Sequence, residues 1–155
     1  MTIVVGTDHG GFSLKPLLIR QLQAAGHRVA DMGTFTADPC DYPRIGAKVG
    51  EAVASGKAQR GLLLCKSGAG MAIVANKFPG VRAAVCQSVS AAQHAREHNN
   101  ANVLVLGAEG LKSRNAATIL RAWISTPFAG GRHARRVRQI RKIEEKIRGK
   151  SCLNI

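Results

Sequence analysis

The sequence predicts an α/β fold in which one parallel, five-stranded sheet lies between two layers of helices. Short apolar runs alternate along the chain with longer segments of helical character. The runs are hydrophobic at nearly every position, as expected of strands that are covered on both faces. A repeated order of strand and then helix is typical of parallel sheets. With 155 residues the chain fits a single domain, residues 1–155, without an internal repeat or linker.

The elements follow one another in a regular order. Each expected strand is a short apolar run, and the first of them breaks at Gly6. Each strand is followed by a longer segment of helical character. The five pairs of strand and helix are Ile3–Val5 and Phe12–Ala25, Arg28–Met32 and Tyr42–Ser55, Leu62–Cys65 and Met71–Lys77, Ala83–Cys86 and Ser90–His98, and Val103–Leu106 and Arg114–Ile124.

A sixth helix is expected at the C-terminal end, over about residues 131–149. Apolar residues recur there every three or four positions, which gives the helix an apolar stripe, and its other face is cationic. The last residues, 150–155, carry no further signal, and we expect them to fray. The stripe comprises Val137, Ile140, Ile143 or Glu144, and Ile147.

Positive charge is concentrated in this terminal segment. The chain carries a formal net charge of +14, and residues 131–150 hold nine Lys or Arg against two Glu, a net +7. Such a cluster suggests an anionic partner, either nucleic acid or a small phosphate. Aromatic platforms for bases are scarce, with one Trp, one Tyr and four Phe, and no nucleic-acid motif is present. The sequence therefore favours a small phosphate over nucleic acid.

Other features predict a cytoplasmic protein with no membrane segment and no cofactor. No apolar run approaches the roughly 18 residues of a membrane span. The first residues, MTIVVGTDHG, lack the basic region of a signal peptide. The cysteines have no C-x-x-C spacing, so neither a zinc site nor a redox dithiol is indicated and free thiols are expected. They are Cys40, Cys65, Cys86 and Cys152.

Three polar stretches bear on a possible site. In open α/β sheets, ligands bind beyond the carboxyl ends of the strands. GTDHGGF follows the first expected strand, and CKSGAG follows the third. EHNNAN precedes the fifth strand, so it belongs to this edge only if the fourth helix ends near it.

The stretch CKSGAG, Cys65 to Gly70, offers a thiol beside a glycine-rich turn. Gly68 and Gly70 permit close backbone approach to a ligand, and the helix that follows offers free N–H groups to an anion. A helix N-terminus and Lys66 would both favour a thiolate at Cys65, which makes it a usable base or nucleophile. Judged by residue type alone, Cys65 is equally well explained as a buried cysteine that packs as a small hydrophobic side chain and has no catalytic role.

Asp8 and His9 end the first strand ahead of two glycines. A carboxylate there can bind sugar hydroxyls, and a histidine can bind phosphate or move a proton near neutral pH. On the residues alone, Asp8 serves equally well as the N-cap of the first helix.

Two further groups are less specific. His98, Asn99 and Asn100 are explained by C-capping and turn chemistry. Arg132 and Arg136 are four residues apart and therefore on one helical face, where two guanidinium groups can clamp one phosphate. A solvated charged face is the commoner case for such pairs.

Taken together, these stretches resemble the B-type ribose-5-phosphate isomerases, which share a fold with the galactose-6-phosphate isomerase subunits. The similarity runs from Met1 to about Ile143, with the motifs in order. The matching stretches are GTDHGGFSLK at 6–15, DYP at 41–43, GEAVASGKA at 50–58, C-x-S-G-x-G-M-x-I-x-ANK at 65–77, AREHNNANVLVLGA at 95–108 and FAGGRHARRV at 128–137.

The resemblance implies a Rossmann-like α/β fold and a homodimer, sometimes paired into a tetramer, with the C-terminal helix packed on a partner subunit. It implies metal-free aldose–ketose isomerisation of a sugar phosphate through an enediolate, in the pentose phosphate pathway. The active sites would lie at the dimer interface, with both chains contributing. Ribose 5-phosphate to ribulose 5-phosphate is the first expectation, and another tetrose, pentose or hexose phosphate is the second. A subunit that has lost catalysis is a further interpretation.

By position, the resemblance also assigns roles to individual residues. Cys65 is the base that moves a proton between C1 and C2, Ser67 serves the reacting oxygens, and His98 opens the sugar ring. The other positions bind or line the substrate. They are the backbone N–H groups of Gly68, Ala69 and Gly70 for the enediolate, Asp8 and Asn99 for hydroxyls, Tyr42 along the site, and His9, Arg132 and Arg136 for phosphate.

Two positions depart from the family pattern. Lys66 stands where the family normally has glycine, and it strains the turn if that position needs a positive φ. Glu109, in Gly107-Ala108-Glu109, stands in place of an arginine that can help bind phosphate. We expect Lys66 and Glu109 to reshape the site by pairing with each other, which leaves the preferred sugar open.

Overall fold

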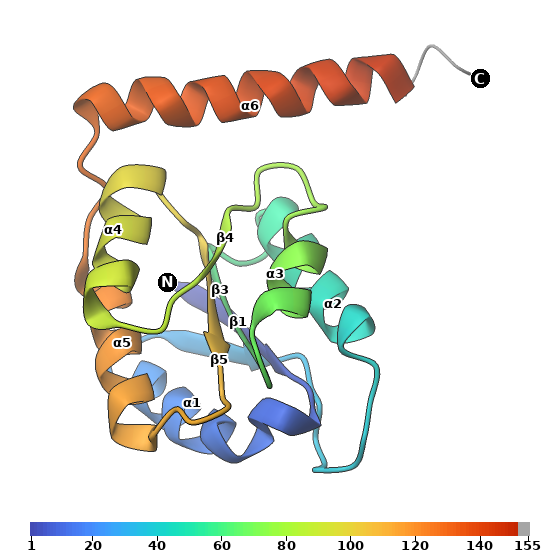
Figure 1. Ribbon diagram of the computed structural model, residues 1–155, viewed down its shortest axis with the longest axis vertical. Coiled ribbons are helices and arrows are strands. Elements are labelled where there is room, and N and C mark those ends of the chain that lie inside the picture. Colours follow the sequence, from blue (N-terminus) through green and yellow to red (C-terminus); the bar gives the residue numbers. More distant parts are fainter. Residues whose placement is uncertain (152–155) are drawn as a thin grey trace.

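The computed structural model describes the backbone of residues 1–151 and the side chains of residues 1–149. It has a five-stranded, all-parallel sheet in the order β2-β1-β3-β5-β4, with helices on both faces (Figure 1). The predicted fold class is confirmed, and every predicted strand end lies within two residues of the observed one. The strands are β1 (Thr2–Thr7), β2 (Arg28–Asp31), β3 (Arg60–Cys65), β4 (Ala83–Val85) and β5 (Val103–Gly107).

Helices cover the sheet in two layers. One layer consists of α1 (Lys15–Ala24), α4 (Val89–Asn99) and α5 (Ser113–Ser125), and its core includes the fully buried Trp123. The other layer consists of α2 (Tyr42–Ala54) and α3 (Ala69–Ala75). Because side chains alternate along a strand, each central strand serves both cores, which explains its unbroken hydrophobicity.

Cys65 belongs to the second of these cores. Along β3, Leu62 and Leu64 pack in the core below α1, α4 and α5, whereas Leu63 and Cys65 pack in the core below α2 and α3. The strand thus delivers the Cys65 side chain to the face of the sheet that α3 covers, at the carboxyl end of the strand.

The first crossover begins with a 3-10 helix, η1 (His9–Leu14), which the sequence does not predict. The α-helix starts only at Lys15, three residues later than expected, with Pro16 in its first turn, where a proline is tolerated. η1 also passes very close to β3: a Cβ atom on Gly11 would lie 2.5 Å from Cβ of Leu64. Glycine at this position therefore keeps the Asp8–Gly11 turn against the end of β3.

A buried lysine ties this turn to the loop after β2. Lys15 is 4% exposed, and its Nζ lies 2.6 Å from Oδ2 of Asp31 and donates a hydrogen bond to the carbonyl oxygen of Thr34. A buried ammonium group needs such partners to offset its lost hydration. The contact fixes the loop after β2 beside η1.

The terminal helix, α6 (Gly131–Ser151), lies across the end of α4 and continues over the loop between α3 and β4, where Oε2 of Glu144 accepts a hydrogen bond from the N–H of Gly80 at 3.1 Å (Figure 1). It is two residues longer than the predicted 131–149, and residues 152–155, including Cys152 and the rest of the tail expected to fray, lie outside the described residues. Three residues of its expected stripe are exposed in the single chain, at 40% for Ile140, 59% for Ile143 and 61% for Ile147, whereas Val137 is half-buried. None of the helices in the described part of the chain is long and apolar enough to span a membrane.

Candidate active site

The turn after β3 brings a thiol together with backbone N–H groups. Cys65 is 5% exposed, and its Sγ accepts a hydrogen bond from the N–H of Gly68 at 3.1 Å. Gly68 has a φ of 85°, which glycine adopts without strain, and α3 begins at the next residue. The cysteine is therefore buried, as its residue type allows, but its sulfur also faces a hydrogen-bond donor that stabilises negative charge.

Ser67 and Tyr42 adjoin this turn. Ser67 is exposed, and its Oγ accepts a hydrogen bond from the N–H of Ala69 at 3.3 Å. The ring of Tyr42, at the start of α2, lies directly over Gly70, because a Cβ atom on that glycine would be 2.6 Å from Cε2 and Cζ of the ring. The structure thus brings the hydroxyl of Ser67, the ring of Tyr42 and the Cys65 turn together.

Lys66 causes no backbone strain. Among the described residues, the only non-glycine with a positive φ is Asn100, so the left-handed position of the turn is Gly68 and not Lys66. The expected pairing of Lys66 with Glu109 is confirmed, with 3.4 Å between Nζ and Oε1. The two departures from the family pattern are thus in contact beside the candidate base.

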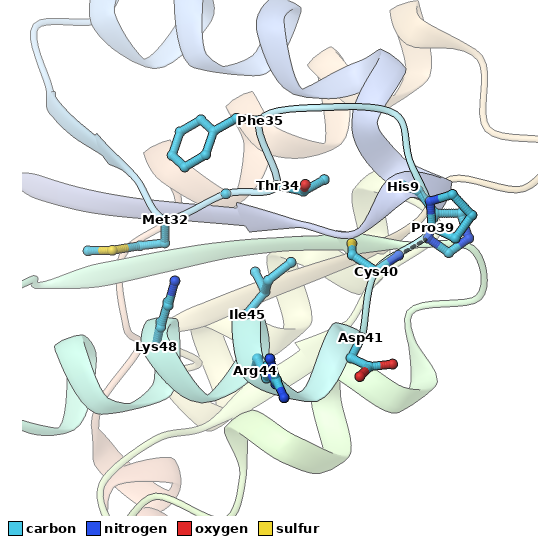
Figure 2. Close-up of a pocket in the computed structure, with 11 residues that line it drawn as sticks. His9, Met32, Thr34, Phe35, Pro39, Cys40, Asp41, Arg44, Ile45 and Lys48 are labelled. Carbon is cyan, nitrogen blue, oxygen red and sulfur yellow. Dashed lines mark hydrogen bonds between the residues drawn. The ribbon is translucent and has the colours of Figure 1, made fainter.

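Asp8 caps η1 and His9 lies on the surface. The Oδ1 atom of Asp8 accepts hydrogen bonds from the N–H groups of Gly10 (2.9 Å) and Gly11 (3.3 Å), so the N-cap interpretation is confirmed. Both bonds end on Oδ1, which leaves Oδ2 for another donor. The Nδ1 atom of His9 accepts a hydrogen bond from the N–H of Cys40 at 3.3 Å (Figure 2), so the neutral ring carries its proton on Nε2.

His9 also borders a cavity of about 730 Å³ between α2 and the loop after β2 (Figure 2). Met32 and Phe35 line it from the loop, and Arg44 and Lys48 line it from α2. Cys65 is not among its lining residues. The cavity therefore reaches His9 and does not open on the sulfur.

His98, Asn99, Arg132 and Arg136 lie at the opposite edge of the sheet. The helix α4 ends at Asn99, just before β5 begins, and the chain that leads into α6 is joined to it by a hydrogen bond from the N–H of Ala129 to the carbonyl oxygen of Glu97 (Figure 1). Cys65 pairs in register with Gly107, at the other end of β5. Four residues of strand correspond to about 13 Å.

This placement corrects one sequence-based expectation. The stretch EHNNAN could share the carboxyl edge only if α4 ended there, and α4 ends at the amino edge. Within one chain the predicted site residues therefore form two separate groups. The first, the carboxyl-edge group, comprises Asp8, His9, Tyr42, Cys65, Ser67, Gly68, Ala69 and Gly70, and the second, the amino-edge group, comprises His98, Asn99, Arg132 and Arg136.

Three histidine rings stack within and beside the amino-edge group. His98 lies between His94 and His133, with ring centroids 5.0 and 4.3 Å apart and planes inclined by 10° and 7°. His133 is 8% exposed, and its Nε2 accepts a hydrogen bond from Nε of Arg132 at 3.4 Å. His133 is not among the predicted site residues, although it directly follows Arg132. Its ring holds that of His98 against α6.

His133 should make the stability of the protein depend on pH. Burial lowers the pKa of His133, and the nearby His98, Arg132 and Arg136 lower it further. The unfolded chain binds this proton with an ordinary pKa of about 6.5, so the free energy of unfolding should fall as the pH drops through that value. Thermal unfolding at about pH 7.5 and 5.5 measures the loss. His133→Phe, which keeps a flat ring, should lose less stability on acidification than the wild type does.

The matched control is His94→Phe, because His94 is exposed on the same stack. It should lose as much stability on acidification as the wild type. Equal losses in the wild type and in His133→Phe would contradict the assignment to His133.

The cysteines of the described residues form no disulfide. Cys40, Cys65 and Cys86 are free thiols. Burial raises the pKa of Cys86 to about 11, so this thiol is almost wholly protonated at neutral pH. In the part of the chain that the structure describes, no three His, Cys, Asp or Glu side chains are grouped to hold a metal ion.

Comparisons with known proteins bear on this arrangement. Residues 3–140 match the model of a family described as Ribose/Galactose Isomerase. Ribose-5-phosphate isomerase B of Escherichia coli is 41% identical over 93% of this chain and 97% of its own. D-erythrulose-4-phosphate isomerase of Pectobacterium atrosepticum is 40% identical over 90% of this chain and 93% of its own. The solved structure of Clostridium thermocellum ribose-5-phosphate isomerase B has a TM-score of 0.92 at 46% identity, over 95% of this chain and 99% of that one.

Proposed function

The chain belongs to the ribose/galactose isomerase family, and on that premise we propose that it is an aldose–ketose isomerase that interconverts ribose 5-phosphate and ribulose 5-phosphate. One observation carries the proposal: the sulfur of Cys65 accepts the N–H of Gly68 at the carboxyl edge of a parallel sheet, where such folds bind ligands. The similarity to two ribose-5-phosphate isomerases B supports the choice of sugar.

The reaction moves a proton between neighbouring carbons. In the open-chain aldose, the thiolate of Cys65 removes the proton from C2, the electron pair forms the C1–C2 double bond, and negative charge collects on O1. Backbone N–H groups at Gly68, Ala69 and Gly70 stabilise this oxyanion. To do so, those of Gly68 and Ala69 leave their bonds to Sγ of Cys65 and Oγ of Ser67. The thiol of Cys65 then returns its proton to C1 as O2 loses its own proton and C2 becomes the carbonyl. The hydroxyl of Ser67 passes the proton from O2 to O1.

The other residues hold the substrate. The free Oδ2 of Asp8 and the amide of Asn99 bind sugar hydroxyls, while Tyr42 lines the site and His98 opens the ring. His9 binds phosphate as a neutral donor through Nε2, a role that its bond from the N–H of Cys40 supports. Two cations on one face of α6, Arg132 and Arg136, complete the phosphate-binding site.

A complete site requires two chains. The carboxyl-edge and amino-edge groups lie at opposite edges of the sheet, so one substrate touches both only if a second copy supplies one of them. The exposed stripe of Ile140, Ile143 and Ile147 gives α6 an apolar face to pack on that copy. A homodimer is the smallest assembly with complete sites, and a tetramer is a pair of such dimers.

The proposal places the enzyme in the cytoplasm. The proposed mechanism needs Cys65 as a free thiol. Among the described residues, Cys40 and Cys86 are free thiols as well. A reducing compartment keeps thiols in this state.

Turnover of a panel of tetrose, pentose and hexose phosphates tests the function. We expect the highest kcat/KM with ribose 5-phosphate. A higher value with a tetrose or hexose phosphate would favour the second candidate, which the similarity to the Pectobacterium enzyme motivates. No turnover at all, together with salt-sensitive binding to DNA, would contradict the proposal and point to a basic binding protein.

A further inference from the structure

We propose that Lys66 is a further ligand of the substrate phosphate, and that the carboxylate of Glu109 holds its ammonium group until substrate binds. The inference rests on the proposed function, because it concerns the anion that the same site would take. It adds a residue that is a cation at neutral pH to the carboxyl-edge group, where His9 binds phosphate as a neutral donor.

The position of Lys66 supports this role. It directly follows Cys65 and lies against the turn that carries His9: a Cβ atom on Gly10 would be 3.0 Å from the backbone nitrogen of Lys66 and 3.2 Å from its Cβ. The lysine thus stands between the η1 turn and the end of β5. Its long, flexible stem can carry the ammonium group along this rim.

The ion pair with Glu109 is weak enough for a ligand to replace. The distance of 3.4 Å between Nζ and Oε1 exceeds that of a strong charge-assisted hydrogen bond, and the two side chains are 75% and 66% exposed. Exposed pairs contribute little because water and salt screen them. A phosphate dianion offers the ammonium group more charge than one carboxylate does.

The pair is not needed to hold the two turns together. The N–H of Ala108 donates to the carbonyl oxygen of Cys65 at 2.8 Å, and the N–H of Glu109 donates to that of Lys66 at 3.0 Å. Gly107 packs against the same turn, since a Cβ atom there would lie 2.6 Å from the carbonyl oxygen of Ser67. The backbone fixes the geometry, which leaves the ammonium group of Lys66 free to act on a ligand.

Binding of inorganic phosphate, measured by calorimetry on the purified protein, tests the inference without requiring turnover. Lys66→Met, which keeps the stem and removes the charge, should raise the Kd for phosphate by about two- to fivefold, the scale of an exposed ionic contact. Glu109→Gln should lower the Kd, because the competing carboxylate is gone. Lys57→Met, at an exposed lysine between α2 and β3, is the control and should change nothing.

Steady-state kinetics then separate the possible roles. The sulfur of Cys65 has the N–H of Gly68 as its partner, whereas the exposed ammonium group of Lys66 is paired with Glu109. Lys66→Met should therefore raise the KM for ribose 5-phosphate in parallel with the Kd for phosphate and leave kcat within about twofold. An unchanged Kd in Lys66→Met would overturn the inference. So would a rise in Kd in Glu109→Gln equal to that in Lys66→Met, because the pair would then serve to hold the turns. Failure of the wild type to turn over any sugar phosphate would instead refute the proposed function.

Discussion

Replacement of Cys65 by alanine is expected to abolish isomerisation and leave the protein folded. The proposed mechanism has no other group to remove the C2 proton, and loss of a positioned general base lowers kcat by up to about 10⁴-fold. KM should change little, because the hydroxyl and phosphate ligands of the substrate remain. Rates of conversion of ribose 5-phosphate, followed in the wild type and in Cys65→Ala, measure the effect.

Cys86→Ala is the matched control for this substitution. Cys86 is also a buried free thiol, at 1% exposure against 5% for Cys65, but it packs in the other core. The same atoms are removed in both variants, so a loss of activity confined to Cys65→Ala cannot come from a general defect in packing. If Cys65→Ala kept most of the wild-type rate, the base would have to be another residue.

Mixing of two inactive variants should restore activity. Each charge-assisted bond to phosphate contributes about 1.5–3 kcal/mol, so loss of both arginines in Arg132→Met/Arg136→Met should lower kcat/KM by about two to four orders of magnitude. Neither this double variant nor Cys65→Ala should be active alone. In a mixed dimer, however, one of the two sites combines the intact Cys65 of one chain with the intact arginines of the other.

The amount of restored activity is set by the symmetry of the dimer. Random mixing of equal amounts gives mixed dimers in about half of the cases, each with one intact site of two, so about a quarter of the wild-type activity should return. Refolding the two variants together and assaying the mixture measures this fraction. Activity that stayed at the level of the separate variants would mean that each site is built within a single chain.

The sheet could be predicted because its physical signal is local. Runs such as Leu62–Cys65 and Val103–Leu106 are apolar throughout, since both faces of the sheet are covered, and glycines or polar residues bound them. The start of the first helix could not be predicted in the same way. A 3-10 turn replaces its first residues because Asp8 caps the turn and Gly11 must pass close to Leu64, which is a contact between distant parts of the chain.

The sequence could predict which residues belong to the site, but not how they are arranged in space. The pairing of Lys66 with Glu109 was expected because both residues depart from the family pattern and carry opposite charges, and the structure contains it. The separation of His98 from Cys65 had a usable signal, because a crossover helix between parallel strands returns to the amino edge before the next strand begins. The stack of His133 on His98 joins two helices far apart in the sequence and leaves no periodic signal.

Exchange of hydrogen with solvent tests the central claim most directly, namely that the sulfur of Cys65 takes a proton from the carbon of the substrate. Ribose 5-phosphate can be incubated with the protein in deuterium oxide and its carbon-bound hydrogens followed by NMR. We expect the wild type to introduce deuterium at C1 of ribulose 5-phosphate, and Cys65→Ala to introduce none. Deuterium entering at the wild-type rate in Cys65→Ala would show that another group removes the proton, and the account of this site would be wrong.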